Sequence, residues 1–304
     1  MYDLVIIGAG PAGLSAAIYA ARAELKFVVL EKEMMSGGQI INTYEVDNYP
    51  GLFHMNGFDL AMKLREHADA LGASFAEGEV EKVEPAAGGK RVLCKDGTAY
   101  ETRTVLISGG AKHRKLGVPG EDRLSGSGVS YCATCDGAFF RNKEVVVVGG
   151  GDVAVEDALF LSRLCKKVTL IHRRDSFRAA KTLVSRLTAA ENIELLLDSA
   201  VKEICGENRV DHILVENRKT QEETEIKADG IFIAVGMLPE TAVYKELVAL
   251  DETGYIMADE TGVTSDPAVF AAGDIRTKAL RQVVTAAADG ANAIQSVERY
   301  LGEY

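Results

Sequence analysis

Residues 3–31 decide the fold class, and they read DLVIIGAGPAGLSAAIYAARAELKFVVLE. The apolar, β-branched run at residues 4–7 predicts a strand that is covered on both faces, as in a parallel sheet. A glycine turn at residues 8–13, a helix at residues 14–23 and a second strand at residues 27–30 follow it. This order of elements is typical of a dinucleotide-binding βαβ unit.

The residues of the turn meet different steric demands. Gly8 permits the tight bend, Gly10 lets the backbone approach a pyrophosphate, and Gly13 lets the helix pack close to the strand. The phosphates would then lie on the free N–H groups at the start of the helix, beside Pro11 and Ala12. We therefore expect this turn to bind a dinucleotide.

The same pattern returns at residues 144–174, which read EVVVVGGGDVAVEDALFLSRLCKKVTLIHRR. A strand is expected at residues 145–148, a helix at residues 155–164 and a second strand at residues 168–171. The turn positions expected to contact a second pyrophosphate are Gly149, Gly151, Asp152, Val153 and Ala154. The repeat predicts a second Rossmann-type domain.

The two copies differ where the adenosine ribose would lie. Glu31 ends the first copy, and a carboxylate there binds a ribose diol and repels a 2′-phosphate, which favours FAD or NAD. The second copy runs instead into His172, Arg173, Arg174 and then Arg178, and guanidinium groups bind the 2′-phosphate of NADP. A solvated basic turn is the alternative, but the chain has a net charge of −11. A resident flavin with NADPH as its donor fits both sites.

The predicted fold class is α/β, with two Rossmann-type, doubly wound, three-layer nucleotide-binding domains, the second inserted in the first. Glycine-rich stretches at residues 108–110 and 236–239 each follow a strand and indicate crossings between the domains. We expect an FAD-binding domain formed by residues 1–111 and 241–304. Residues 112–240 would form the NADPH-binding domain.

The overall charge and hydropathy exclude some functions. A net charge of −11 argues against a nucleic-acid partner, because phosphate binding needs a basic surface. No apolar run reaches the roughly 18 to 20 residues that cross a bilayer, so no membrane role is expected. Residues 1–3 lead straight into the first strand without a signal-like segment, which predicts a cytoplasmic protein.

The chain has five cysteines, an odd number that does not suit a secreted disulfide framework. Cys132 and Cys135 form a C-x-x-C pair, which can close a small ring, and Asp136 beside it could carry the proton that thiol exchange moves. A buried pair without chemistry is the alternative. No second pair and no histidine stand at ligand spacing, so no metal site is predicted. The other cysteines are expected to pack as small apolar residues: Cys94, Cys165 and Cys205.

Over essentially its whole length the chain resembles the bacterial low-molecular-weight thioredoxin reductases. The matching segments are residues 8–13 (GAGPAG), 37–39 (GGQ), 45–51 (EVDNYPG), 132–136 (CATCD), 172–174 (HRR), 177–179 (FRA), 270–274 (FAAGD) and 281–282 (RQ). The resemblance implies a homodimer in which electrons pass from NADPH through FAD to the cysteine pair. Thioredoxin or a thioredoxin-like protein would be the final acceptor.

The resemblance also implies roles for single residues. Cys135 would face the flavin, Cys132 would attack the disulfide of the partner, and Asp136 would be the general acid. Asp274 would hold the ribityl or phosphate region of FAD. Further positions expected to line a cofactor are Gly38, Gln39, Asn48, Val80, Gly110, Gly236, Gly273, Arg281 and Gln282.

The cysteine pair and the NADPH turn lie in the same inserted domain, yet both must reach one flavin. We therefore expect this domain to rotate, with residues 109–110 and 236–239 as hinges. The sequence departs from the family at Ser108 and Gly109, which replace alanine and threonine and should loosen this link. Val153 replaces a small hydroxyl residue, and the lost hydrogen bond would be on the order of 1 to 3 kcal/mol at most.

Rival functions remain open at this point. The electron-donating subunit of an alkyl hydroperoxide reductase shares this fold, but it carries an extra redox domain before the flavin turn. A ferredoxin reductase lacks the cysteine pair. A non-catalytic NADPH-sensing protein need not bind flavin and would not reduce a disulfide.

Overall fold

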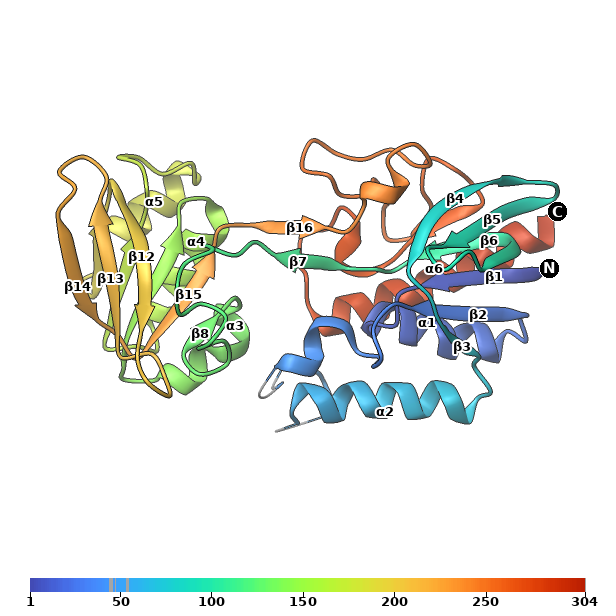
Figure 1. Ribbon diagram of the computed structural model, residues 1–304, viewed down its shortest axis with the longest axis horizontal. Coiled ribbons are helices and arrows are strands. Elements are labelled where there is room, and N and C mark those ends of the chain that lie inside the picture. Colours follow the sequence, from blue (N-terminus) through green and yellow to red (C-terminus); the bar gives the residue numbers. More distant parts are fainter. Residues whose placement is uncertain (44–45, 47, 53–54, 304) are drawn as a thin grey trace. The chain divides into compact units, whose positions relative to one another are not determined.

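The computed structural model describes residues 1–43, 46, 48–52 and 55–303. The described chain divides into two compact units: unit 1 is Met1–Lys112 with Leu238–Tyr304, and unit 2 is His113–Met237. Each unit has a parallel sheet with helices on one face and antiparallel strands on the other (Figure 1). The predicted fold class is confirmed. The antiparallel layer of each unit is a feature that the sequence patterns did not predict.

In unit 1 the parallel strands follow the order β3-β2-β1-β6, and β17 pairs with β6. The first part of β6 also pairs with β5, and β5 pairs with β4, both antiparallel. The strands are β1 (Tyr2–Ile7), β2 (Phe27–Glu31), β3 (Phe75–Glu77), β4 (Val80–Ala86), β5 (Gly89–Cys94), β6 (Ala99–Ile107) and β17 (Val269–Ala271). The helices are α1 (Pro11–Arg22), α2 (Gly57–Ala70) and α6 (Val283–Glu303), with short 3-10 turns η1 (Gly38–Asn42), η3 (Ala242–Tyr244) and η4 (Gly273–Ile275).

Successive side chains of β1 enter different layers, as strand geometry requires. Leu4 and Ile6 pack with helices α1 and α6, whereas Val5 and Ile7 pack with β4, β5 and the segment around Ile256. Burial on both faces explains the continuous apolar run in the sequence.

In unit 2 the parallel strands follow the order β11-β10-β9-β15-β8, and the antiparallel layer follows β12-β13-β14. Val145 and Val147 of β9 face helices, and Val146 and Val148 face the antiparallel layer. The strands are β8 (Val129–Ser130), β9 (Glu144–Gly149), β10 (Lys167–Ile171), β11 (Ile193–Leu196), β12 (Ser199–Cys205), β13 (His212–Asn217), β14 (Glu223–Lys227) and β15 (Gly230–Ala234). The helices are α3 (Ala133–Asp136), α4 (Asp152–Ser162) and α5 (Lys181–Thr188), with a 3-10 turn η2 (Gly137–Phe140).

The two segments that connect the units pair with each other as β7 (Ala111–His113) and β16 (Met237–Pro239). Gly110 and Gly236 lie at their ends with φ of 71° and 106°, values that favour glycine. The Glu240 carboxylate forms ion pairs with Lys32 and Lys112, which fasten this ribbon to unit 1. Within the described chain, no helix is both long enough and apolar enough to span a membrane.

Candidate active site

The first glycine turn shows why each glycine is needed. Gly8 has φ of 101°, and a Cβ on it would lie 2.7 Å from the carbonyl oxygen of Ser108. A Cβ on Gly13 would lie 1.9 Å from the carbonyl oxygen of Gly8. No atom of the described residues lies within 4 Å of a Cβ on Gly10. Gly8 and Gly13 are therefore required by the packing of the chain, whereas the side of Gly10 is open for a ligand.

Two side chains secure this turn. The hydroxyl of Ser108 lies 2.9 Å from the carbonyl oxygens of both Ile7 and Gly8. Serine in place of the alanine that is usual in the family therefore supplies a hydrogen-bond donor to this turn. The Glu31 carboxylate accepts the N–H of Ala9 at 2.7 Å and the N–H of Glu33 at 3.1 Å. Backbone donors thus hold Glu31 beside the turn, at the end of β2.

At the turn η4, polar groups are buried without a partner. Asp274 Oδ1 and Arg281 Nε have no hydrogen-bond partner among the described residues. Burial raises the pKa of the Asp274 carboxyl, and Lys278 and Arg281 oppose this shift. The Arg281 guanidinium lies 4.0 Å from the ring centre of Tyr255. Unpaired buried polar atoms are rare in native chains, and a polar ligand would satisfy these.

Other predicted cofactor residues come together in unit 1. The side-chain amide of Asn48 donates to Gln282 Oε1 at 2.9 Å, which joins two distant segments of sequence. The amide of Gln39 donates to the carbonyl oxygen of Ala111. A Cβ on Gly38 would lie 3.4 Å from the Cα of Gly10, so this loop adjoins the glycine turn.

One predicted cofactor residue is buried in the core, and two residues of a predicted motif lie outside the described residues. Val80 is buried in the core with Val83 and Val92, so its side chain is not available to a cofactor. Glu45 and Asp47 of the motif at residues 45–51 lie outside the described residues.

The second glycine turn repeats the geometry of the first. Gly149 has φ of 158°, and a Cβ on it would lie 2.4 Å from the carbonyl oxygen of Ala234. In the part of the chain that the structure describes, nothing lies within 4 Å of a Cβ on Gly151. A Cβ on Gly150 would lie 2.0 Å from the His172 ring. In both turns the third position, Gly10 or Gly151, is therefore open, and the first, Gly8 or Gly149, is closed by a backbone carbonyl oxygen.

Residues 172–178, which follow β10, form a loop with three arginines that we call the arginine loop. His172 supports this loop from inside unit 2. Its ring is 6% exposed, stacks on the Phe177 ring, and its Nε2 lies 3.1 Å from the carbonyl oxygen of Ser176. Burial lowers the pKa of His172, and the bond to Ser176 opposes this shift. A neutral His172 that packs under Gly150 positions this loop.

Backbone and side-chain bonds join the arginine loop to the second turn. The N–H of Arg178 donates to the carbonyl oxygen of Gly150 at 2.8 Å. The Asp152 carboxylate accepts the N–H of Ala180 at 2.7 Å. Asp152, which the sequence predicted as a cofactor contact, is therefore already engaged in fixing the loop.

The guanidinium groups of this loop are free. Arg173, Arg174 and Arg178 are exposed, and none forms an ion pair with a residue that the structure describes. Val153 is 63% exposed at the start of α4, and Ala154 is buried. An anion could pair with these arginines without displacing an acidic residue.

Cys132 and Cys135 form a disulfide, as expected for a redox pair. The N–H of Cys135 donates to Cys132 Sγ at 3.2 Å, and the hydroxyl of Thr134 lies 3.4 Å from the same sulfur. Donors that point at a sulfur favour its thiolate form. The reduced pair would therefore hold its negative charge on Cys132.

Asp136 lies beside the disulfide with a partner that the sequence did not reveal. The Ser130 hydroxyl donates to Asp136 Oδ2 at 2.6 Å, and Ser130 Oγ itself accepts the N–H of Cys132 at 3.1 Å. Burial raises the pKa of the Asp136 carboxyl, and the bond from Ser130 opposes this shift. A carboxyl that keeps its proton to higher pH suits a general acid.

Comparisons with known proteins agree with these observations. A family model described as "Pyridine nucleotide-disulphide oxidoreductase" matches residues 2–290. The chain belongs to this family. It is similar to the thioredoxin reductase of Bacillus subtilis (strain 168), with 47% identity over 306 residues that cover 100% of the chain and 96% of that protein. It is 44% identical over 301 residues to the "34.2 kDa protein in rubredoxin operon" of Clostridium pasteurianum, covering 99% and 97% of the two chains.

Solved structures agree with the family assignment. The thioredoxin reductase from Streptococcus pyogenes MGAS5005 matches with a TM-score of 0.93 and 48% identity, and the match covers 100% of this chain and 99% of that one. The thioredoxin reductase from Giardia duodenalis matches with a TM-score of 0.93 and 36% identity over 99% of both chains. The resemblance read from the motifs is confirmed, and members of this pyridine nucleotide-disulphide oxidoreductase family use FAD and NADPH.

In this member of the family, sequence analysis missed a network that anchors the redox pair. Glu121 is 2% exposed and accepts the N–H groups of Leu116 and Gly117 and the hydroxyl of Tyr131, at 2.9, 2.7 and 2.9 Å. The His113 ring stacks on Tyr131 with ring centres 5.1 Å apart. Tyr131 precedes the first cysteine, so the network holds the chain that enters the pair. No sequence signal identifies a glutamate as buried.

The remaining cysteines do not form a second redox site. Cys94 and Cys165 are buried and Cys205 is half-buried, and all three are free thiols. Burial raises the pKa of each thiol, which disfavours the reactive thiolate.

Proposed function

We propose that the chain is an NADPH-dependent thioredoxin-disulfide reductase. The observation that carries this proposal is the Cys132–Cys135 disulfide with the adjacent Asp136, whose pKa is raised by burial. The arginine loop for NADPH lies in the same unit as this pair. Relatives with 47% and 48% identity that are named thioredoxin reductases support the choice of substrate.

Unit 1, expected as residues 1–111 and 241–304, would hold FAD. The open side of Gly10 and the free N–H groups at the start of α1 suit its pyrophosphate. The unpartnered Asp274 Oδ1 and Arg281 Nε would bind polar groups of the same molecule, with Gly273, Gln39 and the Asn48–Gln282 pair beside them. Bound FAD would take a hydride from NADPH and pass two electrons to the disulfide.

Unit 2, expected as residues 112–240, would hold NADPH. The open side of Gly151 suits its pyrophosphate, and the free guanidinium groups of Arg173, Arg174 and Arg178 suit its 2′-phosphate. His172 and Asp152 would act by holding the loop in place. Exposed Val153 offers no hydrogen bond here.

The thiol exchange uses three side chains. The Cys132 thiolate, held by the Cys135 N–H, attacks one sulfur of the partner's disulfide and forms a mixed disulfide. The other partner sulfur leaves as a thiolate and takes the proton of Asp136. Cys135 then gives its proton to the Asp136 carboxylate and attacks Cys132 Sγ, which restores the disulfide. The second partner sulfur leaves as a thiolate and takes that proton from Asp136.

We further propose that unit 2 rotates between the flavin-reducing and disulfide-reducing steps. Gly110 and Gly236, at the ends of the β7–β16 ribbon, have positive φ and would absorb the turn. We also propose that the enzyme is a cytoplasmic homodimer, as the family resemblance implies. Light scattering on the purified protein tests the dimer directly.

The test is NADPH oxidation coupled to insulin reduction, with and without thioredoxin. We expect turnover only when thioredoxin is present, and none in Cys132→Ser. An artificial dye that takes electrons from the flavin controls for a loss of NADPH or FAD binding, and Cys132→Ser should still reduce it. Dye reduction without thioredoxin reduction in the unaltered protein would overturn the proposed substrate.

A further inference from the structure

Asp289 is a buried carboxylate among small, mostly apolar residues of α6. It lies in the small-residue run at residues 286–293, AAADGANA, and it is 6% exposed. An aspartate buried on an alanine-rich helix face loses its hydration, so it requires compensating partners. The thiol chemistry and the nucleotide turns give Asp289 no role.

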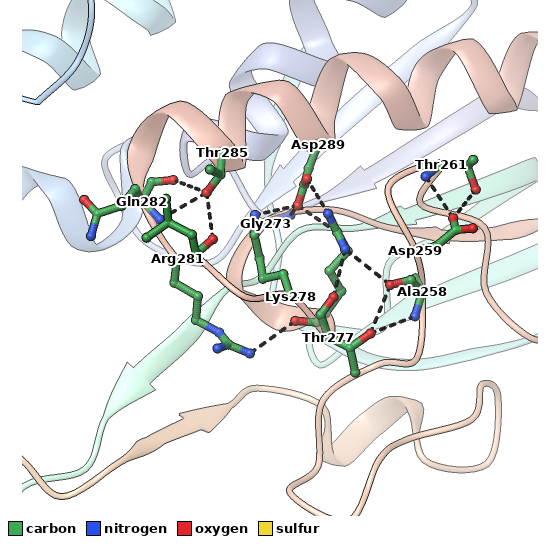
Figure 2. Close-up of polar contacts among 12 residues, drawn as sticks. Ala258, Asp259, Thr261, Gly273, Thr277, Lys278, Arg281, Gln282, Thr285 and Asp289 are labelled. Atoms are coloured by element: carbon green, nitrogen blue, oxygen red, sulfur yellow. Dashed lines mark hydrogen bonds and ion pairs between the residues drawn. The ribbon is translucent and has the colours of Figure 1, made fainter. Parts of the chain in front are cut away.

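Four donors converge on this carboxylate (Figure 2). Arg276 donates from Nε to Oδ2 at 2.8 Å and from Nη2 to Oδ1 at 2.6 Å. Lys278 Nζ and the N–H of Gly273 approach Oδ2 at 2.8 and 2.9 Å. Burial acts to raise the pKa of Asp289, but the bonds from Arg276 and Lys278 outweigh it and hold the pKa below its usual range. Asp289 is therefore charged.

These bonds fix the backbone on both sides of Asp274. Asp289 holds Gly273, the residue before Asp274, by its N–H. Arg276 also donates from Nη1 to the carbonyl oxygens of Ala258 and Thr277, at 3.3 and 2.8 Å. The turn that presents Asp274 is thus bonded to α6 and to a neighbouring loop.

The position of Lys278 is the decisive detail. Its side chain is 6% exposed, and its ammonium shares Asp289 Oδ2 with the N–H of Gly273, the residue before Asp274. At this position its charge opposes the rise that burial causes in the pKa of Asp274. Yet the Lys278 ammonium pairs with Asp289, while Asp274 Oδ1 is buried without a partner. A buried ammonium that loses its partner is strongly destabilising, so Lys278 requires a carboxylate counter-ion.

We propose that Asp289 is a positioning residue for the flavin site: it binds Lys278 and so keeps the Asp274 carboxylate free to accept a hydroxyl hydrogen bond from FAD. Without the Asp289 charge, Lys278 would lose its counter-ion and turn to Asp274. That ion pair would occupy the oxygen that FAD needs. This inference rests on the proposed flavin site of unit 1.

The experiment is a flavin-fluorescence titration of the full-length apoprotein with FAD. Asp289→Asn keeps the shape and an oxygen acceptor for the Gly273 N–H, but removes the charge. We expect its dissociation constant for FAD to rise by about tenfold to a hundredfold, the loss of one charged hydrogen bond. Adding Lys278→Met removes the competing ammonium and keeps the net charge of the cluster, so affinity should return to within about fivefold of the unaltered protein.

Two further variants separate positioning from general stability. In an Asp274→Ala background, Asp289→Asn should weaken FAD binding no further, because the group through which it acts is gone. Asp266→Asn breaks the partly buried pair with Lys90 in the same unit and should leave FAD affinity unchanged.

Three results overturn the inference: unchanged affinity in Asp289→Asn, no recovery with Lys278→Met, or additive losses with Asp274→Ala. If Asp289→Asn does not fold, the double variant with Lys278→Met decides, and a loss above about tenfold refutes the inference. If the unaltered apoprotein itself does not bind FAD, the proposed flavin site fails rather than the role of Asp289.

Discussion

The two open glycines allow the nucleotide sites to be tested separately. Gly10 and Gly151 are the N-cap residues of α1 and α4, with φ, ψ of −73°, −177° and −97°, −176°. Any residue can adopt these extended angles, and no described residue has an atom within 4 Å of a Cβ at either position. We expect Gly10→Val to fold and lose FAD, and Gly151→Val to fold, keep FAD and lose NADPH.

The magnitude follows from the donors that each valine would shield. If a valine blocks two backbone N–H groups from a pyrophosphate, at about 1.5 to 3 kcal/mol for each charged bond, affinity falls by about 10²- to 10⁴-fold. The apoprotein should lose only about 1 kcal/mol, because valine is a poorer N-cap than glycine. Gly13→Ala is the matched contrast: its Cβ would lie 1.9 Å from the Gly8 carbonyl oxygen, and such overpacking costs about 1 to 3 kcal/mol or more.

The assay combines flavin absorbance of the purified variants, calorimetric titration with NADPH and chemical unfolding of the apoproteins. We expect each variant to lose a different cofactor. Gly10→Val should be colourless, with an apoprotein of nearly normal stability. Gly151→Val should be yellow but should not bind NADPH. Full flavin content in Gly10→Val would refute the flavin assignment of the first turn. Equal stability losses in Gly10→Val and Gly13→Ala would refute the distinction between open and packed glycines.

Other predictions concern the arginines and the redox pair. Arg173→Ala and Arg178→Ala should each weaken NADPH binding by about tenfold to a hundredfold and leave the affinity for NADH nearly unchanged. Equal losses of affinity for both cofactors in titrations would show that the arginines only hold the fold. Cys132→Ser should abolish thioredoxin reduction while rapid-mixing spectra still show flavin reduction by NADPH, and any thioredoxin turnover contradicts its role. Asp136→Asn should slow thioredoxin reduction by about 10²- to 10⁴-fold. Because burial raises the pKa of this carboxyl, the rate should fall as pH rises through that pKa, and Asp136→Asn should remove this fall.

The sequence predicts those features that depend only on residues close together in the chain. The apolar run that forms β1, the glycine that needs φ of 101° at Gly8 and the acid that ends β2 at Glu31 all follow from short-range sterics and from burial on both faces. The C-x-x-C pair is of the same kind, because four adjacent residues suffice to close its ring. For these features, spacing alone carries the information.

The features that sequence reasoning missed depend on residues far apart in the chain. Glu121 is buried because Tyr131 and two backbone N–H groups surround it, and no local pattern shows that. Asp289 gave a weak signal, a lone charge in an alanine-rich helix, but its meaning requires Arg276 and Lys278 from another segment. The antiparallel layers were also missed, because short strands such as β14 look like exposed loops in sequence.

The two nucleotide turns show how one backbone geometry can serve cofactors of different charge. Both turns leave the third position open, at Gly10 or Gly151, and close the first, at Gly8 or Gly149, against a backbone carbonyl oxygen. The helix that begins after each turn can therefore offer its free N–H groups to a pyrophosphate. The difference lies beyond the second strand of each copy. Backbone N–H groups hold Glu31 in the first unit, whereas Arg173 and Arg178 in the second have no acidic partner among the described residues. A held carboxylate repels a 2′-phosphate, and unpaired guanidinium groups attract it without first breaking an ion pair. Discrimination between the proposed FAD and NADPH sites therefore requires only side chains after the strand, and the fold itself need not change.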